Sequence, residues 1–213
     1  MPIDAVARAH DIQPSLRMIA TQRLELDPQL AEHADEMFVL LQDPALYQYE
    51  NEAPRSVERL RERFARLETR MSADGTEAWL NWVVRLPGAG LIGFVQATVH
   101  HDGSAGVAYV FGSAHWGQGY AHEAVHAMLC ELAERWKVRA FRAVLKRDNA
   151  RSQRLLARLA FAPAARDAQA PEDIADDETL MVRDIRTARI SWASVDPLLP
   201  HFPRTKAEAD AKP

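Results

Sequence analysis

Hydrophobic and polar residues alternate along several short segments of the chain, a pattern typical of β-strands. The alternation predicts strands at residues 17–26, 78–86, 91–101, 105–111, 138–146 and 179–185. The turn sequences Pro87-Gly88-Ala89-Gly90 and Asp102-Gly103 separate the second, third and fourth of these strands. Because such turns reverse the chain, these three strands are predicted to form an antiparallel meander.

Apolar residues recur at helical spacing in four other segments. They predict helices over about 27–42, 56–71, from the glycines near 117 to about 137, and 149–159. The first helix is expected to begin at Asp27-Pro28, since Asp is a good N-cap and Pro a good first helical residue. Ser56 is the expected N-cap of the second helix. The order of elements predicts an α/β (α+β) fold with a mixed, mostly antiparallel sheet and helices on both faces.

Composition limits the classes of protein to consider. The chain has 213 residues, of which 47% are hydrophobic and 26% charged, so one folded domain is expected. We assign it to 17–187, between a loose arm (1–16) and a C-terminal extension (188–213) in which Trp192 and Phe202 are candidate contacts of a homodimer. The formal charge of −4 shows no basic excess, so nucleic acid is not an expected partner.

The same bulk features predict a location. No apolar run approaches the roughly 20 residues that span a membrane, and the first residues lack the apolar core of a secretory signal. Cys130 stands alone, which fits a reducing compartment and a packed side chain. A cytoplasmic protein without membrane partners is therefore expected.

A glycine-containing turn, Trp116-Gly117-Gln118-Gly119-Tyr120-Ala121, joins strand 105–111 to the following helix. Glycine lets the backbone turn tightly and lets an anion approach its N–H groups. Since a helix N-terminus has unpaired N–H donors and a partial positive charge, the turn predicts a pyrophosphate site. Neither common nucleotide motif fits, because Gln118-Gly119 replaces the Lys-Ser/Thr of a P-loop and His122 replaces the last Gly/Ala of a dinucleotide fingerprint.

A competing motif overlaps this turn. His122-Glu123-Ala124-Val125-His126 is a literal H-E-x-x-H, which would place two imidazoles on one helix face as in a zinc peptidase. The motif has no third-histidine continuation, and the region some twenty residues further on offers Asp148 but no Glu. We therefore keep zinc chemistry as the lesser alternative and predict no metal.

Several segments together resemble the GNAT superfamily of acetyl-CoA-dependent N-acetyltransferases, and more narrowly its ribosomal-protein N-terminal acetyltransferases. They are Thr21-Gln22-Arg23-Leu24-Glu25-Leu26, Leu91-Ile92-Gly93, Trp116 to Ala121 with Glu123-Ala124, Asn149-Ala150-Arg151-Ser152, and Leu159-Ala160-Phe161. The resemblance covers about 17–187 and implies a sheet splayed between strands 105–111 and 138–146. It implies acetyl-CoA as co-substrate, held by Val110, Phe111, Gly112, Trp116, Gly117, Gln118, Gly119, Tyr120, Ala121, His122, Asn149, Arg151 and Ser152.

The resemblance also suggests catalytic candidates. Backbone N–H groups at Phe111 or Gly112 would stabilise the oxyanion. Leu156 stands where many members place a Tyr that protonates the leaving thiolate, so Ser152 is the preferred replacement, with Tyr109 as another candidate. Glu50, in the polar cluster 47–52, is expected either to bind or deprotonate the acceptor or to be a solvated loop carboxylate.

The chain departs from the family pattern at two further positions. Trp116 stands where the family has Gln or Arg before the glycines, and Ala160 stands where it usually has Gly before Phe161. The predicted reaction is direct acetyl transfer to a primary amine of a protein N-terminus or a small molecule. A CoA-binding sensor without turnover is the alternative from another class, motivated by the missing Tyr.

Overall fold

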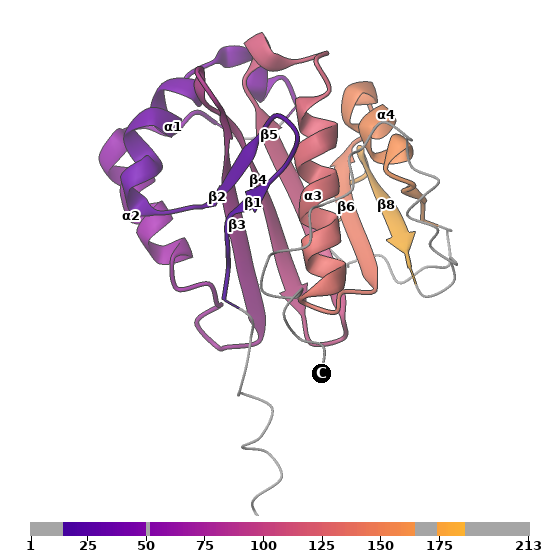
Figure 1. Cartoon of the computed structure of the whole chain (residues 1–213). Coiled ribbons are helices and arrows are strands. Elements are labelled where there is room, and N and C mark those ends of the chain that lie inside the picture. The colour runs from indigo at the N-terminus through magenta and orange to yellow at the C-terminus, as the bar shows by residue number, and fades with distance from the viewer. Residues whose placement is uncertain (1–14, 50–51, 165–173, 186–213) are drawn as a thin grey trace, which may run out of the picture.

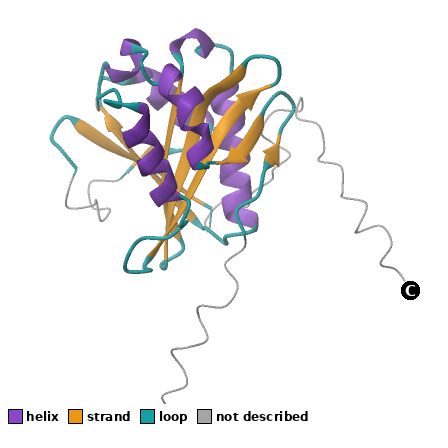
Figure 2. Ribbon diagram, turned by 90° about the vertical axis from the view of Figure 1, so that its left-hand side faces the viewer, coloured by secondary structure: helices purple, strands orange, loops and turns teal. Residues whose placement is uncertain are grey.

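The computed structural model describes residues 15–49, 52–164 and 174–185, and these form one eight-stranded sheet with helices on both faces (Figures 1 and 2). The strands are β1 Ile19–Ala20, β2 Glu25–Pro28, β3 Glu77–Leu86, β4 Gly90–His100, β5 Ser104–Phe111, β6 Ala140–Lys146, β7 Ala162–Pro163 and β8 Glu178–Asp184. The helices are α1 Ala34–Leu40, α2 Val57–Leu67, α3 Tyr120–Glu134 and α4 Ala150–Arg158, with 3-10 turns η1 Ala31–His33, η2 Pro44–Tyr47 and η3 Ser113–His115.

The sheet order is β1-β2-β3-β4-β5-β6-β8-β7, and every pair is antiparallel except β5 with β6. The predicted meander is β3–β4–β5. The parallel β5–β6 pair is joined through α3, which is the crossover that a parallel connection requires. The predicted α/β class, with a mixed and mostly antiparallel sheet, is confirmed.

The sheet separates two hydrophobic clusters. Alternation along β3 sends Val83 to one face and Trp82 and Val84 to the other. On the Val83 face, α1 and α2 contribute the buried side chains of Met37 and Phe64. The opposite cluster contains the buried residues of α3 and α4, so the sheet is the shared middle layer of three.

Strands β5 and β6 separate after a short paired stretch. Their register covers only Ser104–Gly106 against Ala140–Arg142, although β5 continues to Phe111 and β6 to Lys146. The predicted splay between these strands is therefore present. Among the described residues, no strand lies beside the last part of β5 on that side, which faces α4.

The start of the chain differs from its prediction. The single strand predicted at 17–26 is two strands, because Thr21 N–H and its hydroxyl both bond to Leu24 O and form a turn. The helix start predicted at Asp27-Pro28 is wrong, since both residues pair with β3, opposite Val83 and Trp82. The Asp27 carboxylate accepts a hydrogen bond from Arg85 and caps no helix.

Other differences are smaller. The chain forms η2, η3 and β7 where no element was predicted, and the four helices end between one and four residues earlier than predicted. Ser56 is the N-cap of α2, accepting from Arg59 N–H at 3.3 Å, as predicted. Glu50, Trp192, Phe202, most of the arm and the C-terminal extension lie outside the described residues. In the described ranges, no helix combines the length and apolar character needed to cross a membrane.

Candidate active site

The end of β5 presents its backbone alternately to β4 and to the gap beside β6. Gly112 N–H donates to Ile92 O at 3.0 Å, and Val110 is the partner of Phe94 on β4. Because successive residues of a strand point their N–H groups to opposite sides, Phe111 N–H is directed into the gap. Of the two predicted oxyanion donors, Gly112 N–H is already used by β4, so Phe111 N–H is the remaining candidate.

The glycine turn builds the helix N-terminus that the sequence predicts. Gly117 and Gly119 have φ values of +76° and +83°, in the left-handed region that glycine adopts most easily. Gly119 is the N-cap of α3, and the first bond within the helix runs from Glu123 N–H to Gly119 O. The N–H groups of the preceding first turn point out of the helix end, which is favourable geometry for an anion.

Arg23 holds the turn from outside. Its Nη1 donates to Gln118 O at 3.0 Å, and its guanidinium lies 4.5 Å from the centre of the Tyr120 ring. Its Nε donates to Glu123 Oε2 at 2.7 Å. The turn between β1 and β2 therefore braces the start of α3, and this contribution of Arg23 was not predicted from the sequence.

The carboxylate of Glu123 is fully engaged in this brace. Besides Arg23, it accepts hydrogen bonds from the Thr21 hydroxyl at 2.6 Å and from Arg23 N–H at 2.8 Å. Burial alone would raise its pKa, but these hydrogen bonds outweigh burial and lower the pKa of Glu123 below its usual value. A residue committed in this way is a poor general base.

The rest of the H-E-x-x-H segment gives no support to the zinc peptidase hypothesis. The rings of His122 and His126 lie parallel with centres 6.3 Å apart, and among the residues that the structure describes no group of three His, Cys, Asp or Glu is placed to hold a metal ion. Burial lowers the pKa of His126 and raises that of Cys130 to about 11. Both side chains thus behave as packed neutral groups.

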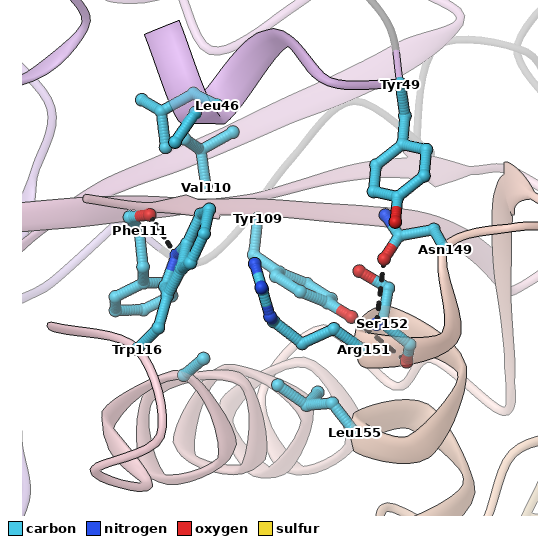
Figure 3. Close-up of a pocket in the computed structure, with 12 residues that line it drawn as sticks. Leu46, Tyr49, Tyr109, Val110, Phe111, Trp116, Asn149, Arg151, Ser152 and Leu155 are labelled. Carbon is cyan, nitrogen blue, oxygen red and sulfur yellow. Dashed lines mark hydrogen bonds between the residues drawn. The ribbon is translucent and has the colours of Figure 1, made fainter. Parts of the chain in front are cut away.

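The first turn of α4 lies across the gap from β5. The Asn149 side chain caps this helix by accepting from Ser152 N–H at 3.1 Å. The Tyr109 hydroxyl donates to Ser152 O at 3.5 Å, so the phenol spans from β5 to α4 (Figure 3). Burial raises the pKa of Tyr109, which keeps the phenol protonated and able to donate.

A pocket opens around these residues (Figure 3). It brings together eight of the predicted site residues, namely Tyr109, Val110, Phe111, Trp116, Ala121, Asn149, Arg151 and Ser152. Predicted residues that do not line it are Gly112, Gly117, Gln118, Gly119, Tyr120 and His122, most of which belong to the turn and the helix end beside it. The other lining residues are Ala45, Leu46 and Tyr49, which form what we call the η2 wall, and Leu155 of α4. Of these, Tyr49 belongs to the polar cluster 47–52 expected near the acceptor, and the other three were not predicted.

Arg151 and Trp116 meet across the pocket. The guanidinium lies 3.6 Å from the ring centre, a cation–π distance, and the Trp116 Nε1 donates to Phe111 O at 2.7 Å. The hydrogen bond thus holds the Trp116 ring against the end of β5, and the cation–π contact holds the Arg151 guanidinium on that ring. A positive charge in the first turn of a helix is unfavourable for the helix dipole, so an anion near Arg151 would stabilise it.

The sequence matches the family model described as acetyltransferase (GNAT) domain over residues 23–162. The chain belongs to this family. The GNAT match contains β2 to β6, the glycine turn, the Asn149 cap and the pocket, and it ends at the first residue of β7. The predicted acetyltransferase activity is confirmed at the level of the family.

Solved GNAT structures share this fold. RimJ of Mycobacterium smegmatis, in complex with a CoA disulfide, is 18% identical with a TM-score of 0.69, covering 84% of this chain and 92% of its own. An acetyltransferase of Salmonella typhimurium that modifies the N-terminal serine of a 50S ribosomal subunit protein is 18% identical with a TM-score of 0.66, covering 79% and 99%. The microcin C7 self-immunity acetyltransferase MccE, in complex with acetyl-CoA and AMP, is 15% identical with a TM-score of 0.61, covering 77% and 93%.

No curated protein sequence matches the chain. The GNAT assignment therefore rests on the family model, with the solved structures supporting the fold.

The GNAT framework gives meaning to two departures noted in the sequence. Leu156, at the position of the family's usual Tyr, is buried in the core with 1% of its surface exposed. Its neighbour Leu155 lines the pocket instead, so this part of α4 offers the pocket an apolar side chain and no phenol. Ala160 has a φ of +62° at the end of α4, in the region where the family's usual Gly is unstrained. The pocket contains two phenols, Tyr49 and Tyr109, and Tyr109 is the one with a hydrogen bond to α4, through Ser152 O.

Proposed function

We propose that this GNAT protein transfers the acetyl group of acetyl-CoA directly to a primary amine, either the α-amino group of a peptide or an amine of a small molecule. The observation that carries the proposal is the continuity of the site. The pocket is lined by Ala121 of the first turn of α3, by the splayed end of β5 and by the start of α4, so an anion site, a gap for an extended arm and a cavity for a reactive group adjoin one another. Two of the neighbours named above were solved with a coenzyme, RimJ with a CoA disulfide and MccE with acetyl-CoA, which supports this choice of co-substrate.

The residues present fit acetyl-CoA, which supplies an acetyl group activated as a thioester. The turn from Gly117 to His122 would hold the pyrophosphate with backbone N–H groups. The backbone of Tyr109 and Phe111, turned into the gap, would hydrogen-bond the amides of the pantetheine arm. The Arg151 guanidinium would either move away from the Trp116 ring and pair with a phosphate of the coenzyme, or stay stacked on that ring above the pantetheine arm.

The pocket supplies polar groups for the transfer itself. Phe111 N–H would donate to the carbonyl oxygen as it gains negative charge, a contribution of about 3–4 kcal/mol for a well-placed donor. The Tyr109 phenol and the Ser152 hydroxyl would deliver a proton toward the thiolate, which forms as the C–S bond breaks. Since a thiol has a pKa of about 8.5, this proton assists the reaction but is not strictly required.

The pKa of the acceptor favours an α-amino group. At pH 7 an α-amino group, with a pKa of about 8, is roughly one-tenth neutral, whereas a lysine amine near 10.4 is almost entirely protonated. An α-amino acceptor therefore needs little help from a base, whatever the position of Glu50. The Salmonella neighbour modifies an N-terminal serine, which agrees with this choice. We further propose that the catalytic domain spans 17–187 and works in the cytoplasm.

The proposal is tested by mixing the full chain with acetyl-CoA and short peptides that differ only in their first residue, and measuring thiol release. We expect turnover with a free N-terminus and none with the same peptide acetylated beforehand. A lysine side chain in a blocked peptide should react at least about tenfold more slowly, because less of its amine is neutral. A protein that binds CoA but releases no thiol with any amine would instead be a sensor, and one that does not bind CoA would contradict the proposal altogether.

A further inference from the structure

The carboxylate of Asp43 joins two loops that are far apart in the sequence. Its Oδ1 accepts from Ala45 N–H at 3.0 Å and so caps η2. Its Oδ2 accepts from the N–H of Ser113, the first residue of η3, at 3.0 Å across a separation of 70 positions. Hydrogen bonds from the Ser113 hydroxyl and N–H, and from Ala45, lower the pKa of Asp43, so the group is a carboxylate at neutral pH.

Each of the two loops carries one side of the pocket. Residues Ala45, Leu46 and Tyr49 of the η2 wall follow Asp43 directly. Ser113 stands two positions after Phe111, whose N–H faces the gap, and three before Trp116. In Figure 3, Leu46 and Tyr49 lie on one side of β5, and Trp116 and Arg151 lie on the other.

The other recorded hydrogen bonds of the η2 segment do not reach β5. The Tyr47 hydroxyl donates to Leu41 O at 2.6 Å, and Leu46 N–H donates to Asp43 O at 3.1 Å, which folds the segment on itself. Gln42 Nε2 donates to Pro54 O, toward α2. Within described residues 41–49, the bond from Ser113 to Asp43 is therefore the hydrogen bond that ties the wall to the connection after β5.

We propose that Asp43 is a positioning residue of the transferase site, which sets the place of the η2 wall relative to the Phe111 donor without touching either substrate. The inference rests on the proposed function, because it takes the η2 wall as the side from which the amine approaches. A carboxylate suits this task, since both of its oxygens accept from N–H groups. An asparagine at this position offers one carbonyl oxygen and one NH₂ group. The oxygen can accept from the N–H of either Ala45 or Ser113, but the NH₂ group would then point its hydrogens at the remaining N–H, and neither of these two groups could accept the other's hydrogen.

The test compares Asp43→Asn with a matched control, Asp74→Asn. Asp74 also accepts hydrogen bonds in a turn, from Ser72 and Thr76, and these bonds lower its pKa to about 2, but the turn is remote from the pocket lining. The probe is a peptide with a free N-terminus, assayed with acetyl-CoA by thiol release, while CoA binding is measured by calorimetry. For Asp43→Asn we expect kcat/KM for the peptide to fall by about tenfold, mostly through KM, with the Kd of CoA changed by less than about twofold. For Asp74→Asn both quantities should stay at the wild-type value.

Two results would overturn the inference. One is a wild-type KM for the peptide in Asp43→Asn. The other is an equal loss of peptide and CoA affinity together with a lower melting temperature, which would mark Asp43 as an ordinary structural residue. Hydrogen exchange gives a readout that needs no turnover: the amides of Ala45, Leu46 and Ser113 should exchange faster in Asp43→Asn than in the wild type or in Asp74→Asn. If these amides exchange at the same rate in Asp43→Asn and in the wild type, the positioning role of Asp43 is refuted, whether or not the protein is active. If they exchange faster in Asp43→Asn but the wild type acetylates no peptide, the result counts against the proposed function instead.

Discussion

Arg23 Nε lies 2.7 Å from Glu123 Oε2, although 100 positions separate the two residues. The same arginine also bonds to Gln118 O within the glycine turn. Since Glu123 belongs to the first turn of α3, the pair sets the angle between the turn and the helix whose N–H groups face the anion site. We therefore expect binding of the coenzyme to depend on this contact with the β1–β2 turn, which lies outside the proposed site.

Replacing Glu123 with Gln should weaken CoA binding. Glutamine has a single carbonyl oxygen for the three donors from Thr21 and Arg23, so hydrogen bonds to a charged group, each contributing about 1.5–3 kcal/mol, are lost. We expect the Kd of CoA to rise by about tenfold, measured by calorimetry. The control is Glu77→Gln, which removes a carboxylate paired with His100 at the far end of β3 and β4 and should leave the Kd unchanged.

The same carboxylate predicts a pH dependence of stability. The folded-state pKa of Glu123 is lowered, so its stabilising contribution is present above the unfolded value of about 4.5 and is lost as the pH falls through the lower folded pKa. Melting temperatures measured between about pH 5 and pH 3 should therefore decline more steeply for the wild type than for Glu123→Gln. Parallel curves would show that Glu123 does not titrate as proposed.

Tyr109→Phe removes the phenol that bridges β5 and α4 without removing its ring. If the phenol delivers a proton toward the leaving thiolate, kcat should fall by about tenfold to a hundredfold while the Kd of CoA changes little. Because burial raises the pKa of Tyr109 above its usual value of 10.0, the wild-type rate should show no loss from ionisation of this group between about pH 6 and 9. Tyr120→Phe, which keeps its ring beside Arg23, is the matched control and should retain kcat; a loss equal to that of Tyr109→Phe would refute the assignment.

Ala160→Gly should stabilise the protein. Ala160 N–H bonds to Ala157 O and Phe161 N–H to Leu156 O, the pair of bonds that closes a helix through a left-handed residue. An alanine in that conformation costs about 1–2 kcal/mol, which exceeds the entropy that glycine loses on folding. We expect a melting temperature about 2–4 °C higher. Ala157→Gly, the same change inside α4, should lower it instead.

Gly93→Ala should damage the strand end that carries the pocket. A Cβ at this position would collide with Val110 O and press on the Phe111 ring, so β5 would have to move away from β4. We expect lower thermal stability and weaker CoA binding, each measured on the purified protein. Gly106→Ala is the control, because a Cβ there meets nothing within 4 Å, and it should have little effect on either measurement.

Local patterns predicted the elements whose signals are themselves local. Alternation in β3, β4 and β5, the turns at Gly88 and Gly103, and the Ser56 cap all depend on neighbouring residues, and the structure contains each of them. The positive φ of Gly117 and Gly119 follows from the same kind of reasoning.

Tertiary contacts decided what the sequence did not reveal. Asp27-Pro28 has a good helix-start signal, but pairing with β3 takes both residues into the sheet, and hydrogen bonding along a strand outweighs a cap. Leu46 and Tyr49 line the pocket together with β5 residues 60 or more positions away, and the bond from Ser113 to Asp43 that links these loops is a contact that no local pattern indicates. The sequence could not choose between the Phe111 and Gly112 donors, because the bond from Gly112 N–H to Ile92 O depends on the register of β4 against β5.

The three-layer arrangement has a consequence for how this protein can evolve. The glycine turn, α3 and α4 belong to one face of the sheet, whereas the η2 wall follows α1 on the other, with a hydrophobic cluster of its own around Met37 and Phe64. Substitutions that reshape the α1–α2 layer thus leave the packing beneath the α3 helix end intact. If the η2 wall binds the acceptor as proposed, we expect acceptor preference to change among descendants of this protein more readily than binding of the acetyl donor.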